Sequence, residues 1–225
     1  MALHAIVSYD DTPNDHDALI LGGLLAAAGA RLTLAYVRHS LQPRHDREAL
    51  EEHEAEALLE RGARLLGDES IPRRVVVSPS TAEGLGWLAT SERADLIVFG
   101  SEYRTAVGHV SPGRTVQTLL EGGPALAIAP AGYQFVHARV ETIGLLSSGD
   151  EAAVETARGL ASHYGATLTD SAYGVDLLVA GSRAEARQGR VMLTSQTQNV
   201  LDGASAPVLV VARGVALDFG ALVTA

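Results

Sequence analysis

The sequence repeats itself, and this repetition limits the fold more than any other feature. The run ADLIVFGS at residues 94–101 is matched by VDLLVAGS at 175–182. The helix and strand that follow the first run, RTVQTLLEGGPALAIA, are matched by SQTQNVLDGASAPVLVV at 195–211. Internal similarity of this kind indicates two related units in one chain. We therefore expect a duplicated fold whose second copy is shorter than the first.

Strands and helices alternate along the first copy. Ser80 followed by Glu83 fits a capping box at the start of one helix, and Trp87 in that helix is expected to be buried. Alternation of this type predicts an α/β fold, a doubly wound parallel sheet with helices on both faces. The runs expected to form its strands are apolar and β-prone, and they lie at 5–9, 31–37, 73–78, 94–100 and 125–130.

Composition excludes several classes of function. The net charge of −10 and the lack of a basic block argue against nucleic acid and anionic membranes as partners. The chain has no cysteine and no lysine, which excludes thiolate chemistry and a lysine Schiff base. No apolar run is long enough to cross a membrane. We expect a soluble, cytoplasmic protein.

The titratable residues do not form a recognisable catalytic or metal motif. His45 and His53 are two helical turns apart, too far to share one metal ion without further ligands, so no metal site is expected. Asp10 and Asp11 are adjacent, and neighbours on an extended chain point to opposite faces, so they do not make a catalytic pair. Asp11 is expected to serve the turn. The chain is not expected to be an enzyme.

The glycine spacing after the fourth expected strand points to a known family. In the first copy, positions Gly100, Tyr103, Gly113 and Arg114 follow the spacing Gly, two residues, Gly, nine residues, Gly, then Ser or Thr. In the second copy, the same positions are held by Gly181, Ala184, Thr194 and Ser195. With the opening IVSYDDT, the chain resembles a tandem universal stress protein, and the resemblance covers nearly all of residues 4–213.

This resemblance implies a fold and a ligand. The family's strand order 3-2-1-4-5 is expected to be duplicated with the second copy truncated, and the two units are expected to pack as a pseudo-dimer through edge strands 125–130 and 207–211. The family implies a regulatory or ligand-sensing protein, with ATP or AMP as the ligand to test first. The resemblance places Asp10 at the adenine-contacting aspartate. We also expect the whole chain to form a homodimer.

The candidate nucleotide site lies where the strand order reverses, because ligands of doubly wound sheets bind there, beyond the carboxyl ends of the strands. Asp10 can accept a hydrogen bond from an adenine amino group or a ribose hydroxyl, and backbone groups of Val37 can pair with the adenine edge. Gly100 lets the main chain approach the ribose. Gly113 and the amides after it form a helix start that favours phosphate.

Two departures from the family pattern leave two interpretations open. Tyr103 replaces a glycine, and Arg114 replaces a hydroxyl residue. In one interpretation Arg114 grips a phosphate by a charge-assisted contact, assisted by Arg104 and His109. In the other, Arg114 is a solvated residue at a helix start and the loop is only a connector.

The second copy is expected to lack a nucleotide site. Asp10 and Gly100 are ninety positions apart, but the matching Ser148 and Gly181 are only thirty-three apart. We expect that residues 166–169 do not form a full second strand, and that the helix at 151–163 crosses to the opposite face from its counterpart.

The chain is thus divided into a complete unit at 1–137, a shortened unit at 138–213 and a tail at 214–225, with 131–139 as the linker. The tail is expected to pack on a partner or to remain loose. The leading hypothesis is a non-catalytic, ligand-sensing stress protein that binds an adenine nucleotide in its first unit. The alternative is a ligand-free interaction protein that acts through its dimer surface.

Overall fold

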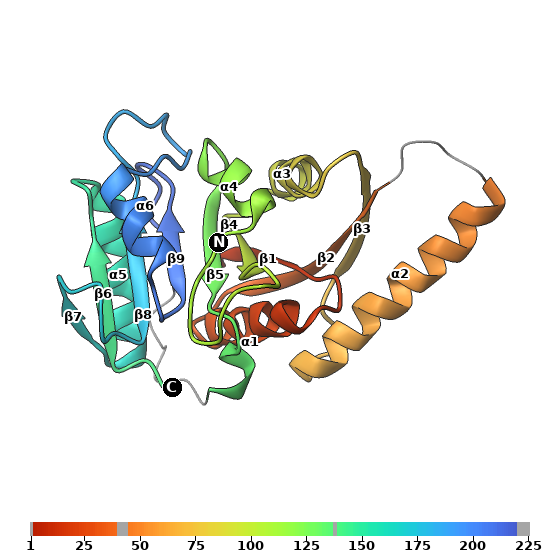
Figure 1. Ribbon diagram of the computed structural model, residues 1–225, viewed down its shortest axis with the longest axis horizontal. Helices are drawn as coiled ribbons and strands as arrows, with labels where there is room; N and C mark the ends of the chain where they lie inside the picture. The colour runs from red at the N-terminus through yellow and green to blue at the C-terminus, as the bar shows by residue number, and fades with distance from the viewer. Residues whose placement is uncertain (1, 40–44, 137–138, 220–225) are drawn as a thin grey trace.

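The computed structural model describes residues 2–39, 45–136 and 139–219, and Figure 1 shows an elongated α/β molecule built on one continuous sheet. Within these residues the strands lie in the order β3-β2-β1-β4-β5-β9-β8-β6-β7. Every neighbouring pair is parallel except β5 and β9. The strands are β1 (His4–Ser8), β2 (Arg31–His39), β3 (Arg73–Ser78), β4 (Leu96–Gly100), β5 (Ala125–Ala129), β6 (Thr142–Leu146), β7 (Thr167–Thr169), β8 (Leu177–Gly181) and β9 (Val208–Val211).

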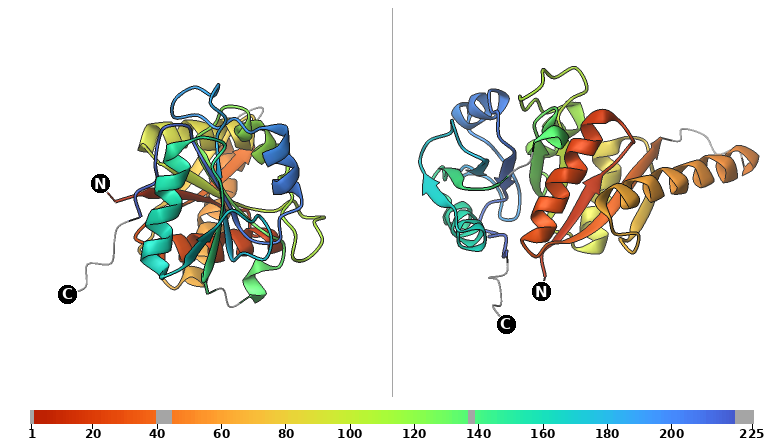
Figure 2. Two further views of the ribbon diagram at one scale, coloured as in Figure 1. Left: turned by 90° about the vertical axis from the view of Figure 1, so that its left-hand side faces the viewer. Right: turned by 90° about the horizontal axis from the view of Figure 1, so that it is seen from below.

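Helices cover both faces of this sheet. In the view from below, α1 and α2 lie in front of the strands (Figure 2). Right-handed crossovers place α3 and α4, which contact one another, on the other face. None of the described helices has the length and apolar content that a membrane crossing requires. The helices are α1 (Pro13–Ala27), α2 (His45–Leu66), α3 (Thr81–Glu92), α4 (Arg114–Leu120), the 3-10 turn η1 (Tyr133–Phe135), α5 (Glu151–Tyr164) and α6 (Ser195–Asp202).

The predicted capping box of α3 forms only on its Ser80 side, and Trp87 is not buried as expected. The Ser80 side chain caps α3 by accepting a hydrogen bond from the Glu83 amide. Trp87, expected to be buried, is 64 % exposed. The residues that α3 buries are Ala82, Gly84, Leu85, Leu88 and Ala89. Trp87 falls outside that stripe, because the side of a helix that meets the sheet is set by tertiary packing and not by residue type.

The two units join at the predicted edge strands. We call β1–β5 with their helices the first unit, and β6–β9 with theirs the second unit. β5 and β9 pair antiparallel, with Leu126 opposite Val210, Ala127 opposite Leu209 and Ile128 opposite Val208. All six residues are buried. The expected pseudo-dimer is confirmed, with its seam inside one chain.

The expectation that residues 166–169 do not form a second strand is wrong. β7 pairs in parallel with β6, so that Thr167 lies opposite Thr142. The second unit therefore has the order β7-β6-β8-β9, which corresponds to β2-β1-β4-β5 of the first unit. The strand is short, however, with three residues against nine in β2.

The register explains why so short a connection suffices between β7 and β8. β7 ends with Thr169 opposite Gly144, and β8 begins with Leu177 opposite Ile143. The connection therefore has to run back along the sheet by only about one residue before β8 begins. The connection crosses β6 at Gly144. A Cβ built there would lie 2.4 Å from the carbonyl oxygen of Ser171, so only glycine leaves room for the crossing chain.

The expected change of face for the helix at 151–163 is also wrong. α5 joins β6 to β7 as α1 joins β1 to β2, and a right-handed crossover then puts both helices on the same face. The Tyr164 hydroxyl of α5 donates a hydrogen bond of 2.7 Å to the Leu24 carbonyl oxygen of α1. A helix on the opposite face could not make this contact.

The described part of the tail packs on its own chain. Leu217 and Phe219 are each 3 % exposed, and the Leu217 amide donates to the Thr156 hydroxyl of α5. The expectation of a loose or partner-bound tail is therefore wrong for 214–219, and 220–225 lie outside the described residues. The shortened unit uses this segment to cover α5.

Candidate functional site

Asp10 lies just beyond the carboxyl end of β1, at the predicted switch point between β2 and β4. Among the described residues its carboxylate has no hydrogen-bond partner, whereas its amide donates to Asp15. Asp10 is exposed as a residue, yet its surroundings partly remove the carboxyl from water. This burial raises the pKa of Asp10, the Asp15 charge raises it further, and His39 lowers it. The structure thus leaves a free acceptor at this edge.

The neighbouring carboxylates, in contrast, are engaged. Asp15 completes a capping box with Thr12 at the start of α1, accepting from its hydroxyl at 2.6 Å. Asp11 adopts a φ of 57°, as its predicted turn role requires. Its carboxylate also accepts from the Tyr9 hydroxyl at 2.7 Å and from Arg61 of α2 at 2.7 Å.

The sequence analysis missed this second role of Asp11. The hydrogen bonds from Tyr9 and Arg61 lower the pKa of Asp11 to about 2. Its partner Arg61 is fifty positions away, and no local pattern connects them. The Asp11 network fixes the turn that carries Asp10, because it ties the end of β1 to α2.

Val37 presents its backbone to the same place. Hydrogen bonding between β1 and β2 runs as far as the Tyr9 amide, which donates to the Ala35 carbonyl oxygen at 2.9 Å. Backbone groups of alternate residues face the same neighbouring strand. The N–H and C=O of Val37 therefore point towards the β1 side, beyond Tyr9 and beside Asp10.

Gly100 has a structural explanation that the sequence did not reveal. A Cβ at Gly100 would lie 1.8 Å from the carbonyl oxygen of Asn14 at the start of α1. The Asn14 side chain then donates to the carbonyl oxygens of Ser101 and Glu102, each at 2.8 Å. The space expected for a ribose beside Gly100 is thus occupied at this point by the α1 main chain.

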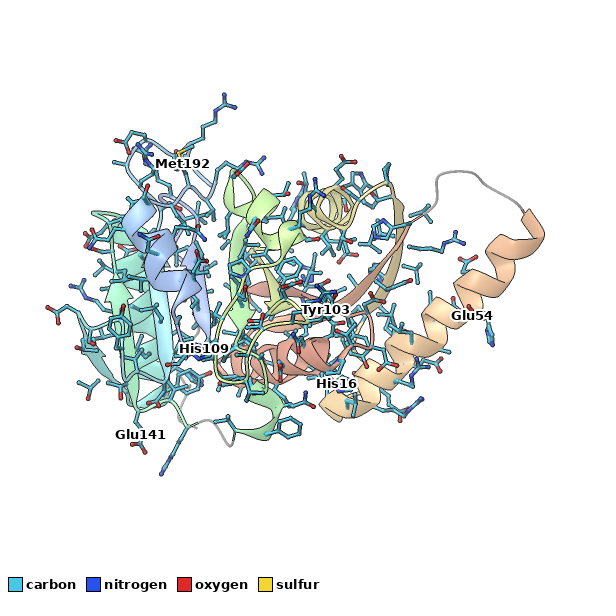
Figure 3. The ribbon with its side chains drawn as sticks, in the orientation of Figure 1. His16, Glu54, Tyr103, His109, Glu141 and Met192 are labelled. Atoms are coloured by element: carbon cyan, nitrogen blue, oxygen red, sulfur yellow. The ribbon has the colours of Figure 1, made fainter. Side chains whose placement is uncertain are left out.

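Tyr103 and its loop point to solvent. Tyr103, labelled in Figure 3, is 67 % exposed. The guanidinium of Arg104 lies 5.0 Å from the centre of its ring. His109 is bonded through its backbone to Ala106 and Ala131, towards β5 and away from Arg114. Neither Arg104 nor His109 is placed by the structure at the start of α4.

The helix start at Gly113 is open but has an acidic neighbour. No side chain caps α4 at Gly113, and α4 has only seven residues. A Cβ at Gly113 would touch the Cβ and Cγ of Glu102 at 3.6 Å. Arg114 borders a pocket of about 280 Å³ between the starts of α3 and α4, together with Ser80, Thr81 and Glu83.

The corresponding edge of the second unit is closed by its own side chains. Thr194 caps α6 by accepting from the Thr197 amide. Its hydroxyl lies 2.8 Å from the Thr197 hydroxyl, which in turn lies 3.4 Å from that of Ser148. Ser148 stands where the first unit has Asp10, as predicted. β7 ends at Thr169, so no strand residue takes the place of Val37.

Comparisons with known proteins agree with the geometry. The model of the universal stress protein family matches residues 1–125 and 165–212. A comparison with curated proteins finds no match. The fold is similar to a universal stress protein from Archaeoglobus fulgidus DSM 4304, with 14% identity, a TM-score of 0.70, and coverage of 94% of this chain and 98% of that chain.

A second solved structure gives the same result for the fold. A functionally unknown protein from Pseudomonas aeruginosa PAO1 is 14% identical, with a TM-score of 0.60 over 94% of this chain and 93% of that chain. The family match spans well over half of the sequence, in two segments that fall in the two units.

Proposed function

The chain belongs to the universal stress protein family, and we propose that it is a non-catalytic, ligand-sensing member that binds an adenine nucleotide, ATP or AMP, in its first unit only. The observation that carries this proposal is the free carboxylate of Asp10 beside the backbone of Val37, which faces the β1 side beyond the last hydrogen bond between the two strands. An acceptor next to a backbone donor and acceptor suits the edge of an adenine ring. Its neighbours Asp11 and Asp15, in contrast, are both engaged in structural hydrogen bonds.

The lack of catalysis is proposed from the same geometry. A general base needs a carboxylate that can reach the proton it removes. Asp15 is held in the capping box, and Asp11 is held by Tyr9 and Arg61. Both of these carboxylates are fixed in structural roles, and the nearby His39 is paired with the Thr81 hydroxyl at 3.1 Å.

Two side chains of opposite charge stand where the phosphate end of the ligand is expected. Arg114 supplies a positive charge near the start of α4, but the stem of Glu102 beside Gly113 brings a negative charge to the same place. If Arg114 grips phosphate, then AMP binds more tightly than adenosine, and Arg114→Ala removes that difference. Equal binding of AMP and adenosine to the native chain would assign Arg114 to the helix start alone.

A thermal-shift screen with ATP, AMP and adenosine, with and without Mg²⁺, tests the proposal directly. Ligand at a hundred times its dissociation constant stabilises the folded state by about 2.7 kcal/mol. This is large enough to raise the melting temperature visibly. The control is Asp10→Ala, which should melt at the native temperature without ligand and should lose the shift. No shift with any of the three ligands at millimolar concentration contradicts the proposal.

The alternative, an interaction protein without a ligand, is favoured by one observation. Among the described residues β3 is an edge of the sheet; its Val77 is 55 % exposed, and Trp87 of the following helix α3 is 64 % exposed. Exposed apolar residues on a free edge invite pairing. In this alternative the chain forms a homodimer through β3. Sedimentation of the native chain and of Trp87→Glu at tens of micromolar tests it, and a monomer in both samples rejects it.

A further inference from the structure

The loops that follow β4 and β8 have the same hydrogen bonds, although their sequences differ. Ser101 donates through its hydroxyl to the Ala129 carbonyl oxygen, and Ser182 donates in the same way to Val211. The first residue after each serine then bonds across its loop, Glu102 to Ser111 at 2.9 Å and Arg183 to Met192 at 2.8 Å. The fold therefore imposes one loop shape in both units.

Each loop is also bonded to the other unit. The Val110 amide donates 2.8 Å to the Ala204 carbonyl oxygen, in the turn between α6 and β9. The Val191 amide donates 3.0 Å to Gly123, in the turn between α4 and β5. Val110 is 1 % exposed and Val191 is 0 % exposed, so water cannot replace either partner. We call these two bonds the Val110 strap and the Val191 strap.

Besides β6, α5 and the short edge strand β7, the second unit retains the elements nearest the first unit. It lacks counterparts of α2, β3 and α3, which lie far from the seam in the first unit. It keeps β8, β9, α6 and the loop between them, which form the seam and the Val110 strap. A unit kept only to bury the β5 edge would need β9, but it would not need the turn at Ala204 in this position.

We propose that the second unit is a built-in partner that holds the ligand loop of the first unit, residues 101–113, in its binding shape through the Val110 strap. This inference rests on the proposed function, because it assigns the loop to ligand binding. The loop joins the end of β4 to the start of α4, and Glu102 and Gly113 meet at its two ends. The middle of the loop is also bonded to Ala131 of the first unit through Gly108 and His109. Releasing Val110 therefore loosens the arm from 110 to 113 and lets its end at Gly113 move away from Glu102.

The pseudo-symmetry supplies a matched control. Val110→Pro removes the amide of the first strap, and Val191→Pro removes the amide of the second. Both substitutions replace a buried valine at the equivalent place, so they cost similar packing and shift the melting temperature by similar amounts. Only the first releases the ligand loop. A glycine inserted between Gly203 and Ala204 moves the accepting carbonyl instead, and it tests the first strap without altering the loop.

Hydrogen exchange of the native-length chain without ligand is the first measurement. A lost hydrogen bond of about 1.4 kcal/mol corresponds to about tenfold, so Val110→Pro should speed exchange of the Glu102 and His109 amides about tenfold. Val191→Pro should speed Arg183 and Arg190 instead, and leave the first loop unchanged. Equal exchange of the first loop in both variants overturns the inference.

AMP titration is the second measurement and separates the two proposals. If the native chain binds AMP, Val110→Pro and the glycine insertion should weaken binding about tenfold, by the same conversion, and Val191→Pro should leave it unchanged. Undiminished affinity in the first two variants overturns the inference while the proposed function stands. If the native chain binds no AMP but exchange changes as expected, AMP is rejected as the ligand, and the Val110 strap is still shown to hold the loop.

Discussion

The two units have the same strand order around the same glycine, but different groups stand at the carboxyl ends of their strands. At the first unit's edge, Asp10 is free and the start of α4 has no side-chain cap. At the second unit's edge, Ser148 and Thr194 are joined through Thr197. The comparison teaches that the glycine spacing indicates the fold, whereas the capacity to bind a ligand depends on the side chains around it.

The largest expected effect tests the close backbone contact that Gly100 and Gly181 make in the two units. Gly100→Ala should destabilise the chain by about 3 kcal/mol, because its Cβ would collide with the main chain of Asn14. Gly181→Ala should act in the same way, since its Cβ would lie 2.3 Å from the Ser147 carbonyl oxygen. Urea unfolding measures both, and Gly86→Ala in α3, whose Cβ would make only an ordinary contact of 3.9 Å with Leu119, is the control. If Gly100→Ala unfolds at the native midpoint, the glycine is not structural.

The next largest loss of stability is expected at Asp17 of α1, which binds the chain segment that follows β5. Asp17 is fully buried and accepts from the Gly132 and Gln134 amides, each at 2.8 Å. Asp17→Ala leaves two partly buried donors unpaired and should cost about 2 kcal/mol in urea unfolding. Asp17→Asn keeps one acceptor and should cost less. An equal cost for both variants would show that the charge matters and not the hydrogen bonds.

The third effect is on AMP affinity and concerns the free carboxylate of Asp10. Asp10→Ala should weaken AMP binding about tenfold, a loss of about 1.4 kcal/mol, without changing the urea midpoint. Calorimetric titration measures the affinity. The reverse change in the second unit, Ser148→Asp, should not create a site, because β7 ends before the counterpart of Val37. A second AMP bound by Ser148→Asp would show that strand length is irrelevant.

The smallest effect is a pH dependence confined to the first unit. The hydrogen bonds from Tyr9 and Arg61 lower the folded pKa of Asp11 to about 2, below its ordinary value of 3.8. The stability that Asp11 adds is therefore fully present above pH 4 and is lost as the pH falls towards 2. Asp11→Asn should cost about 1 kcal/mol at pH 7, since the pair is partly exposed, and less at pH 2. A cost independent of pH would contradict the role of its charge.

Much of the fold could be predicted because its signals are local. The repeated run before Gly100 and Gly181 revealed the duplication, and apolar edge strands revealed the seam. The second strand of the second unit was missed because its length depends on register. Only the pairing of Thr169 with Gly144 shows that a short strand needs little chain to return.

The site could be predicted less well, because its contacts join distant positions. Asp10 and Val37 were found from their places at strand ends. The Asn14 oxygen above Gly100 could not be found, since the two residues are eighty-six positions apart and no pattern connects them. The position of Arg114 beside α3 depends on how two helices pack, which composition does not record.

The number and place of bound AMP molecules test the central claim most directly. Calorimetric titration gives the number of sites, and hydrogen exchange with and without AMP gives their place. The account predicts one AMP per chain, with protection around Asp10 and residues 100–114 and none around Ser148 and 181–195. Two AMP per chain, or protection centred on Ser148 and Thr194, would contradict it.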